Sequence, residues 1–480
     1  MLYQLSYVTI PVCGRGTKVD KIRKAANFHG PRRVRAGFSG YLVCNLIMVQ
    51  QIAFLFVLAV ATFFIIRRVR FLQKTIRLGK ENPITDRTGE RWRNVMLVAF
   101  GQKKMFKRPL AAVFHFFIYA GFLIINLEVL EFIIDGLAGT HRIFAPFLGS
   151  VYPMLMNFFE LLAVAVLMAC LIFLCRRFIL RLPRFWSAEM TSWPRWDAAI
   201  ILVTEIVLMC AILLMNASDQ QLQVFDPHYT NTGPLFFSSL LFPLLEASDR
   251  TTLVIIERFC WWFHIAGIFG FAVYITYSKH LHIFMAFPNT YFARLEPNGY
   301  IRNMPFVTRE VRSMLGLEAQ ASAPAGEPGR FGAKDINDLP RTALLSAYAC
   351  TECGRCTSEC PANQTGKLLS PRKVMMDVRD RMEEVGRSID TGGPGLADGK
   401  SLMGNYITKE EINACTSCNA CVEACPVMIS PLDIILELRR YVAMEESGSP
   451  SQWNTMFQNI ETNFAPWKFP ASDRFNWAKD

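Results

Sequence analysis

Five long apolar segments in the first 280 residues constrain this chain more than any other feature. A helix needs about 20 residues to cross a hydrocarbon core about 30 Å thick. The fourth segment is the shortest and contains Glu205. The segments are residues 48–66, 109–134, 153–175, 198–215 and 254–278. We therefore expect an all-α membrane protein with a bundle of five transmembrane helices.

The basic residues between these segments predict the orientation of the helices. Lys and Arg gather in loops 67–108 and 176–197, whereas loops 135–152 and 216–253 hold one Arg each, Arg142 and Arg250. Cytoplasmic loops carry the excess of Lys and Arg, so the fifth helix ends on the cytoplasmic side. We predict a multi-pass protein of the cytoplasmic (inner) membrane. Topology and anionic lipid headgroups explain the net charge of +11, and we expect no nucleic acid partner.

Residues 1–47 do not fit this topology, because they would lie outside the cell yet contain eight Lys and Arg residues. The sequence from Met48, MVQQIAFLFVLAVATFFII, resembles a natural start. No apolar core with a small-residue cleavage site follows the basic residues, so they are not a signal peptide. Two interpretations remain, a genuine N-terminal extension or an over-extended gene prediction. The intact mass of the purified protein distinguishes them.

Two cysteine-rich runs, CTECGRCTSECP and CTSCNACVEACP, follow the apolar half, and each matches C-x2-C-x2-C-x3-C-P. Three closely spaced thiolates suit one [4Fe–4S] cluster, and the fourth binds the other cluster in two-cluster ferredoxins. The first cluster then takes Cys350, Cys353, Cys356 and Cys425. The second cluster takes Cys415, Cys418, Cys421 and Cys360. Zinc is the main alternative, and two four-cysteine repeats that each end in Pro disfavour it.

The surroundings of the cysteines predict a helical type of ferredoxin domain on the cytoplasmic side. The stretches SPRKVMMDVRDRMEEV and PLDIILELRRYVAM have apolar residues at helical spacing. The small residues of EAQASAPAGEPGRFGAKD indicate a flexible linker. We therefore divide the chain into an extension, a transmembrane domain, a linker, a ferredoxin-type domain and a partner-binding tail: residues 1–47, 48–285, 286–340, 341–445 and 446–480.

Histidines within the apolar segments are candidate haem ligands, since ionisable groups are costly in lipid. On an ideal helix, His264 and His282 lie on one face about 27 Å apart. His115 and His282 both lie at cytoplasmic helix ends, so the two predict one bis-histidine b-type haem. A second haem would use His264, but the positions opposite it are Ile125 and Asn126. The alternative is that these histidines are hydrogen-bonded packing or interface residues.

The apolar half resembles the gamma-type cytochrome b subunit of respiratory nitrate reductase, through His115, His264 and His282. The usual second histidine of helix two is missing here. The C-terminal half resembles the ferredoxin part of heterodisulfide reductase, through its eight cysteines and the tail TMFQNIETNFAPWKFPASDRFNWAKD. In those families such a tail leads to CCG motifs, and this sequence contains none. The resemblance implies a CCG-bearing catalytic module on another chain.

These features predict a membrane-anchored electron-transfer subunit of an iron–sulfur oxidoreductase. It would connect the quinone pool with a cytoplasmic CCG-domain partner, or with an electron-transfer flavoprotein, through b haem and two [4Fe–4S] clusters. The direction is open, and we favour quinone reduction. Glu128, Glu131 and Glu205 are either proton relays to quinone or neutral hydrogen-bonded side chains. A redox-sensing or assembly anchor without quinone turnover is the alternative. A self-sufficient enzyme is disfavoured, because the Gly-rich stretch 393–401 lacks P-loop spacing.

Overall fold

The computed structural model describes residues 37–226, 229–317, 330–393 and 398–479, and the chain divides into two compact units. Unit 1 contains the residues up to Val69, Phe106–Leu182 and Met190–Ser278. Unit 2 contains Arg70–Met105, Pro183–Glu189 and Lys279–Asp480. Unit 2 therefore draws on three separate stretches of the sequence. Residues 1–36 of the predicted extension 1–47 lie outside the described residues.

The prediction of five helices long and apolar enough to cross a membrane is confirmed for the described residues. The fourth helix is much longer than the predicted 198–215, and the first begins ahead of residue 48. The helices are α1 (Gly37–Ile76), α3 (Pro109–Ala138), α5 (Val151–Leu174), α6 (Trp193–Phe225) and α8 (Arg250–Ile275). A π-helical turn, Cys175–Ile179, extends α5.

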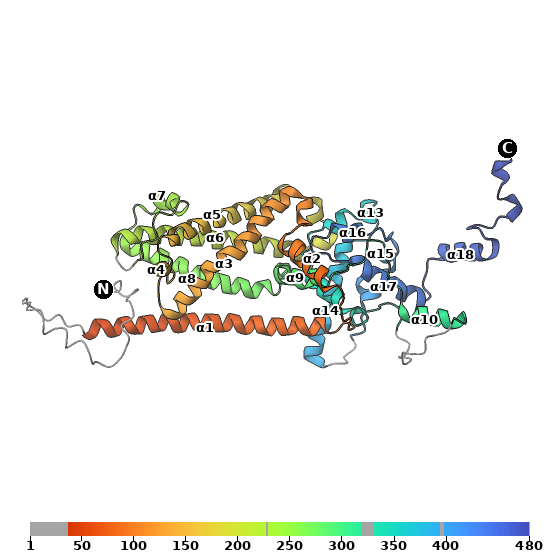
Figure 1. Ribbon diagram of the computed structural model, residues 1–480, viewed down its shortest axis with the longest axis horizontal. Helices are drawn as coiled ribbons and strands as arrows, with labels where there is room; N and C mark the ends of the chain where they lie inside the picture. The colour runs from red at the N-terminus through yellow and green to blue at the C-terminus, as the bar shows by residue number, and fades with distance from the viewer. Residues whose placement is uncertain (1–36, 227–228, 318–329, 394–397, 480) are drawn as a thin grey trace, which may run out of the picture. The chain divides into compact units, whose positions relative to one another are not determined.

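Helix α5 packs against both α3 and α6, and α6 packs against α8. Figure 1 shows these four long helices gathered in one bundle. Close approach requires small residues at the contacts: a Cβ on Gly121 of α3 would meet Val166 of α5 at 2.4 Å. Phe54 of α1 packs its ring against Trp261 and Phe269 of α8, with ring centroids 6.0 and 5.8 Å apart. The core of unit 1 is thus apolar helix-to-helix packing.

The polar end of α6 explains why this helix exceeds its predicted length. Asn216 and Asp219 are buried, and both bind Arg142 from the loop after α3. The guanidinium of Arg142 donates to Asn216 Oδ1 at 2.8 Å and to Asp219 Oδ2 at 2.9 Å. Because these polar groups have charged or amide partners, the helix continues beyond the hydrophobic run that defined the prediction.

Unit 2 is also helical, and the described residues contain no β-strand beyond two isolated bridges, Lys80 with Pro340 and Met403 with Ile407. Its helices before the first cysteine run are α2 (Thr88–Asn94), α9 (His282–Tyr291), α10 (Pro305–Met314) and α11 (Arg341–Ala349). The later ones are α12 (Arg355–Ser358), α13 (Pro361–Gln364), α14 (Pro371–Gly392), α15 (Lys409–Asn413), α16 (Ala420–Ala424), α17 (Pro431–Met444) and α18 (Ser451–Asn463).

The core of unit 2 includes residues far outside the predicted ferredoxin-type domain 341–445. Leu72 at the end of α1 and Leu281 before α9 belong to it. Ile336 and Leu339 are fully buried in the same core, although they fall in the predicted linker 286–340. The division of the chain into five parts stays a prediction. Residues 318–329 of the linker lie outside the described part.

Candidate functional site

The two cysteine repeats have the same backbone shape. Between the first and second cysteines, Glu352 and Ser417 have positive φ values of 55° and 57°. After the second cysteine, Gly354 and Asn419 do so as well, at 72° and 63°, and the short helices α12 and α16 begin there. Gly and Asn adopt this left-handed conformation at low cost. Each repeat therefore wraps its first three cysteines around a tight loop.

A Ser-Pro pair starts the long helix that follows each repeat. The Ser370 hydroxyl accepts a hydrogen bond from the Lys373 backbone N–H at 3.3 Å and caps α14. The Ser430 hydroxyl accepts from the Asp433 N–H at 3.4 Å and caps α17. Pro suits the first helical position because its missing N–H needs no partner there. Helices α14 and α17 contact each other and so join the repeats.

The structure groups the cysteines across the two repeats. One cavity of about 30 Å³ is lined by Cys350, Cys353, Cys356 and Cys425. Burial raises the pKa of the Cys415 and Cys421 thiols, and the nearby Cys360 and Cys418 raise both further. We call the first set the cluster-one site and the second set the cluster-two site. These are the predicted sets, and iron ligation by them stays a prediction.

The environment of the thiols fits [4Fe–4S] clusters. The N–H groups of Ser417 and Ile429 donate to the sulfur atoms of Cys415 and Cys425 at 3.4 and 3.3 Å, as is usual around clusters. Among the described residues, no three His, Cys, Asp or Glu side chains are placed to hold a single metal ion. Cluster thiolates stand further apart, since each binds a different iron. Burial raises the pKa of Cys350 to about 12, so iron must displace protons from the thiols.

Buried charged residues hold the loop of the cluster-one site. Glu352 is 3% exposed, forms an ion pair with Lys279, and accepts from Arg379 Nη1 at 2.6 Å. Arg355 is also buried and donates to the backbone carbonyl of Met105 at 3.4 Å. These contacts fix the loop from segments both before and after it in the sequence.

Among the described residues, Arg372 on α14 is one of the largest fully buried side chains, and it lines the cavity of the cluster-one site. Its guanidinium donates to Glu189 Oε1 at 2.7 Å and to the Arg184 carbonyl at 2.6 Å. A Cβ on Gly354 would stand 2.5 Å from Arg372 Nη1, so this position requires glycine for space as well as for its φ. A role for Arg372 was not predicted from the sequence. The sequence shows only that this charged residue directly follows the Ser370-Pro371 start of a helix.

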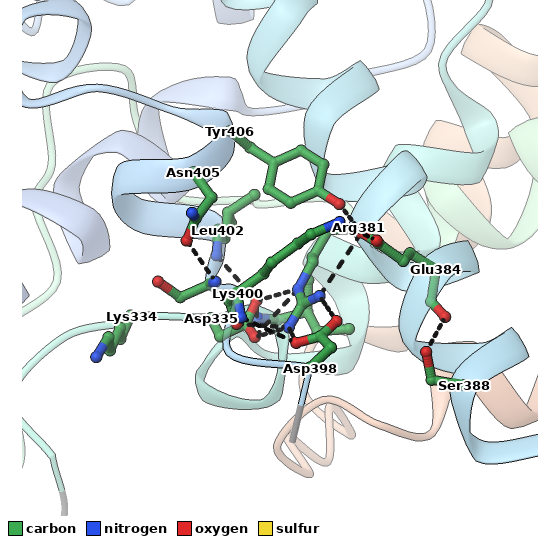
Figure 2. Close-up of polar contacts among 12 residues, drawn as sticks. Lys334, Asp335, Arg381, Glu384, Ser388, Asp398, Lys400, Leu402, Asn405 and Tyr406 are labelled. Atoms are coloured by element: carbon green, nitrogen blue, oxygen red, sulfur yellow. Dashed lines mark hydrogen bonds and ion pairs between the residues drawn. The ribbon is translucent and has the colours of Figure 1, made fainter. Parts of the chain in front are cut away.

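A second polar network positions the segment that leads into the second repeat. Figure 2 shows buried Arg381 of α14 between Asp335 and Asp398. Arg381 Nη2 lies 2.8 Å from Asp335 Oδ2 and donates to the Lys400 carbonyl at 2.7 Å, and its Nη1 pairs with Asp398. The Leu402 N–H donates to Asp335 at 3.1 Å. This network fastens the segment from Asp398 to Leu402 onto the helix of the first repeat.

His264 lies in a packed setting inside unit 1. It is 2% exposed, its Nδ1–H donates to the Leu208 carbonyl at 3.0 Å, and its ring lies 6.0 Å from the ring of Phe132. Phe132 follows His115 by 17 residues on α3, about 25 Å along the axis. His115 and His264 therefore lie at different levels and do not bind one haem together. The α3 side chain in ring contact with His264 is Phe132, seven residues beyond the predicted Ile125.

His282 is not on the same helix as His264, so the prediction that they share one helical face is wrong. Helix α8 ends at Ile275, where the Thr276 hydroxyl donates back to the Val273 carbonyl, and α9 begins at His282. The His282 Nδ1–H donates to the Lys279 carbonyl at 3.1 Å. Burial lowers its pKa to about 4 and keeps the imidazole neutral, the form that binds metals.

His282 belongs to unit 2, whereas the half-buried His115 belongs to unit 1. Their pairing on a haem stays a prediction.

Of the intramembrane carboxylates, Glu131 is hydrogen-bonded. It accepts from the Tyr152 hydroxyl at 2.8 Å and from the Phe144 N–H at 2.9 Å. Glu128 is buried, and its Oε1 lies 3.7 Å from Arg142 Nη1. Glu131 thus fastens the loop after α3, whereas the Oε1 atom of Glu128 accepts no hydrogen bond from any described residue.

The described residues thus combine five helices long and apolar enough to cross a membrane with two cysteine repeats, which is consistent with an electron-transfer role. Residues 349–429 match a family model described as a 4Fe-4S dicluster domain. The chain therefore contains a 4Fe–4S domain, and its predicted likeness to iron–sulfur oxidoreductases is confirmed by the relatives that follow.

The chain is 29% identical over 468 residues to "Probable iron-sulfur-binding oxidoreductase FadF" of Bacillus subtilis, which covers 92% of this chain and 61% of that protein. It is 25% identical to "EtfAB:quinone oxidoreductase" of Syntrophomonas wolfei, over 82% of this chain and 54% of that protein. It is 32% identical to "Probable membrane-anchored ferredoxin" of Chromohalobacter salexigens, over 34% of this chain and 26% of that protein. The chain thus spans little more than half the length of the first two.

Heterodisulfide reductase subunits of Methanosarcina also match, over 147 and 108 residues, in line with the predicted resemblance. The resemblance to the nitrate reductase gamma subunit stays a prediction. No solved structure matches the chain significantly.

Proposed function

We propose that this chain carries electrons between the membrane quinone pool and a soluble redox protein, through two [4Fe–4S] clusters held by its cysteine repeats. The observation that carries the proposal is the crossed grouping of the thiols, with Cys425 of the second repeat beside Cys350, Cys353 and Cys356 of the first. A bound [4Fe–4S] cluster supplies one-electron transfer at a potential set by burial and hydrogen bonds. The chain's own residues hold, bury and orient the clusters.

The quinone part of the proposal is supported by the relative named EtfAB:quinone oxidoreductase. Reduction of one quinone to quinol takes two electrons and two protons, so one-electron carriers must deliver electrons twice. We propose a soluble electron-transfer flavoprotein as donor and quinone as acceptor. The reverse direction, from quinol to a CCG-bearing iron–sulfur partner, would use the same residues. We place the cysteine repeats on the cytoplasmic side of the inner membrane, because Lys and Arg gather in the loops expected there.

One b-type haem between His115 and His282 is part of the proposal. The carbonyl of Lys279 fixes Nδ1 of His282 as the protonated nitrogen, an arrangement common in metal-bound histidines. We propose no second haem at His264, a proposal supported by the ring of Phe132 of α3 lying 6.0 Å from the His264 ring. An optical spectrum tests this part: His115→Ala should remove a b-type band and leave the iron–sulfur signals unchanged. If the b-type band persists in the His115→Ala variant, the assignment of His115 as a haem ligand is refuted.

The central experiment uses the full chain, purified in detergent and loaded with iron and sulfide. We expect two [4Fe–4S] signals in electron paramagnetic resonance (EPR) spectra of the reduced protein. A quinol analogue should change the absorbance of the oxidised protein, because electrons then reach the clusters. The alternative function, a redox-sensing or assembly anchor, predicts loaded clusters without any quinol-linked change. That outcome would reject the proposed function.

A further inference from the structure

The two cysteine repeats share a backbone shape but differ in their surroundings. The residue before the second cysteine is Glu352 in the first repeat and Ser417 in the second, and the residue before the third cysteine is Arg355 or Ala420. Glu352 and Arg355 are buried, whereas Cys418 of the second repeat is exposed. The two repeats therefore have similar sequences but differ in how far their loops are exposed to solvent.

The loop of the cluster-one site is fastened to segments that the chain joins directly to transmembrane helices. Glu352 pairs with Lys279, which follows α8 by four residues. Arg355 donates to the carbonyl of Met105, four residues before α3. Arg184, shortly after the π-helical turn of α5, lies against the same loop, where a Cβ on Gly354 would meet its side chain at 3.3 Å. Three membrane connections thus converge on this one site.

The loop 415–418 of the cluster-two site is held from α17, and outside this loop Lys104 of the segment before α3 donates to the Val422 carbonyl of α16 at 3.4 Å. Arg439 of α17 donates to the backbone carbonyls of Ile412 at 2.8 Å and Asn413 at 3.2 Å, and also to that of Cys415. Thr416 and Cys418 lie on the outer side of this loop and are exposed. The exposed positions are uncharged, so a protein surface can approach them without displacing an ion pair.

We infer that the membrane part exchanges electrons at the cluster-one site, and that a soluble one-electron carrier protein exchanges electrons at the cluster-two site. This inference rests on the proposed function and gives the order in which electrons pass through the two cluster sites. In the proposed direction, the carrier loses one electron at the cluster-two site, and the same electron passes to the cluster-one site and on toward quinone. No proton or atom is transferred between the two sites, since only an electron moves.

A paramagnetic probe tests the order on the full chain in detergent. A water-soluble dysprosium chelate shortens the spin relaxation of centres near the protein surface, and this effect falls steeply with distance. We expect it to accelerate the relaxation of the cluster-two signal several times more than that of the cluster-one signal. Equal acceleration of both signals, or a stronger effect on cluster one, would overturn the inference.

Two conservative variants assign the signals. Arg379→Gln removes a cation that binds Glu352 in the cluster-one loop, and Arg439→Gln removes the cation at the carbonyl of Cys415. A reduced cluster is more negative than an oxidised one, so each variant should shift one midpoint potential downward and leave the other unchanged. Both variants retain all eight cysteines, so cluster content serves as a folding control. A shift of the same signal by both variants would contradict the separate surroundings assigned to the two sites.

Rapid-freeze EPR after addition of a quinol analogue separates this inference from the proposed function. If the cluster-one signal appears first, both the inferred order of the two sites and the proposed quinone exchange are supported. If the cluster-two signal appears first, the inferred order fails while quinone exchange stands. If neither cluster is reduced, the proposed quinone exchange fails, and the dysprosium result still decides which site faces the solvent.

Discussion

Arg372→Gln should destabilise unit 2 strongly, because Arg372 is the fully buried member of an ion pair beside the cluster-one site. The change leaves Glu189, whose side chain is 12% exposed, without its charged partner, and removes the donor to the Arg184 carbonyl. Loss of one partner of a buried pair costs roughly 3–5 kcal/mol, and the partial exposure of Glu189 favours the lower end. At roughly 2–4 °C per kcal/mol, we expect an apparent Tm lower by roughly 6–12 °C.

Arg387→Gln on the same helix is the matched control. Arg387 is 70% exposed and forms an i,i+4 pair with Glu383 at 2.7 Å. Exposed pairs contribute less than about 1 kcal/mol, so this variant should unfold close to the parent protein. The assay is thermal unfolding of the purified full chain, followed by circular dichroism and by loss of iron–sulfur absorbance.

A double variant, Arg372→Gln with Glu189→Gln, tests whether the two side chains act as a pair. The combined loss should be smaller than the sum of the single losses, because the second change no longer leaves a charge unpaired. If Arg372→Gln unfolds no earlier than Arg387→Gln, the burial argument is refuted. Additive losses in the double variant would show that the two residues act independently.

Three further predictions concern the same unit. Cys425→Ser should abolish the EPR signal of the cluster bound by the first repeat, and Cys360→Ser that of the other; damage in the reverse pattern would overturn the crossed ligation. Hydrogen bonds from the Arg381 guanidinium, drawn in Figure 2, lower the pKa of Asp398 below its usual value of 3.8. Its stabilising contribution is therefore present above about pH 4 and is lost as the pH falls through the lowered pKa, so Asp398→Asn should lower Tm at pH 7 and flatten the acid limb of a Tm-against-pH profile. Gly332→Ala would place a Cβ 2.2 Å from a backbone carbonyl of α17 and should cost far more stability than Gly366→Ala, which has positive φ but open space, as denaturant titration of both variants would show.

The five apolar helices could be predicted because the length and composition of an apolar run depend only on neighbouring residues. The same local rule missed the polar end of α6, since Asp219 is stabilised by Arg142 from a loop 77 residues away. The break between α8 and α9 was also missed, because hydropathy continues through it while the hydroxyl of Thr276 turns back onto the helix end.

The cysteine spacing suggested the crossed sets, because the crossed rule is a property of the repeat itself, and four of these cysteines line one cavity, while iron ligation stays a prediction. The residues that hold the cluster-one loop could not be predicted. Arg372 and Glu189 are 183 positions apart, and Arg355 and Met105 are 250 positions apart. Contacts at such separations leave no periodic pattern in one sequence, and the charged residues involved resemble ordinary surface residues until their burial is known.

The three-part origin of unit 2 has a consequence for the biosynthesis of this protein. Residues 70–105 and 183–189 leave the ribosome long before the cysteine repeats, yet they pack in one compact body with them. The early loops must therefore stay accessible while the later helices insert, until the last cysteine at position 425 has been made. Under the proposed ligation, iron delivery would be a late step of assembly, and a fragment that begins after α8 would lack part of its own core, including Leu72.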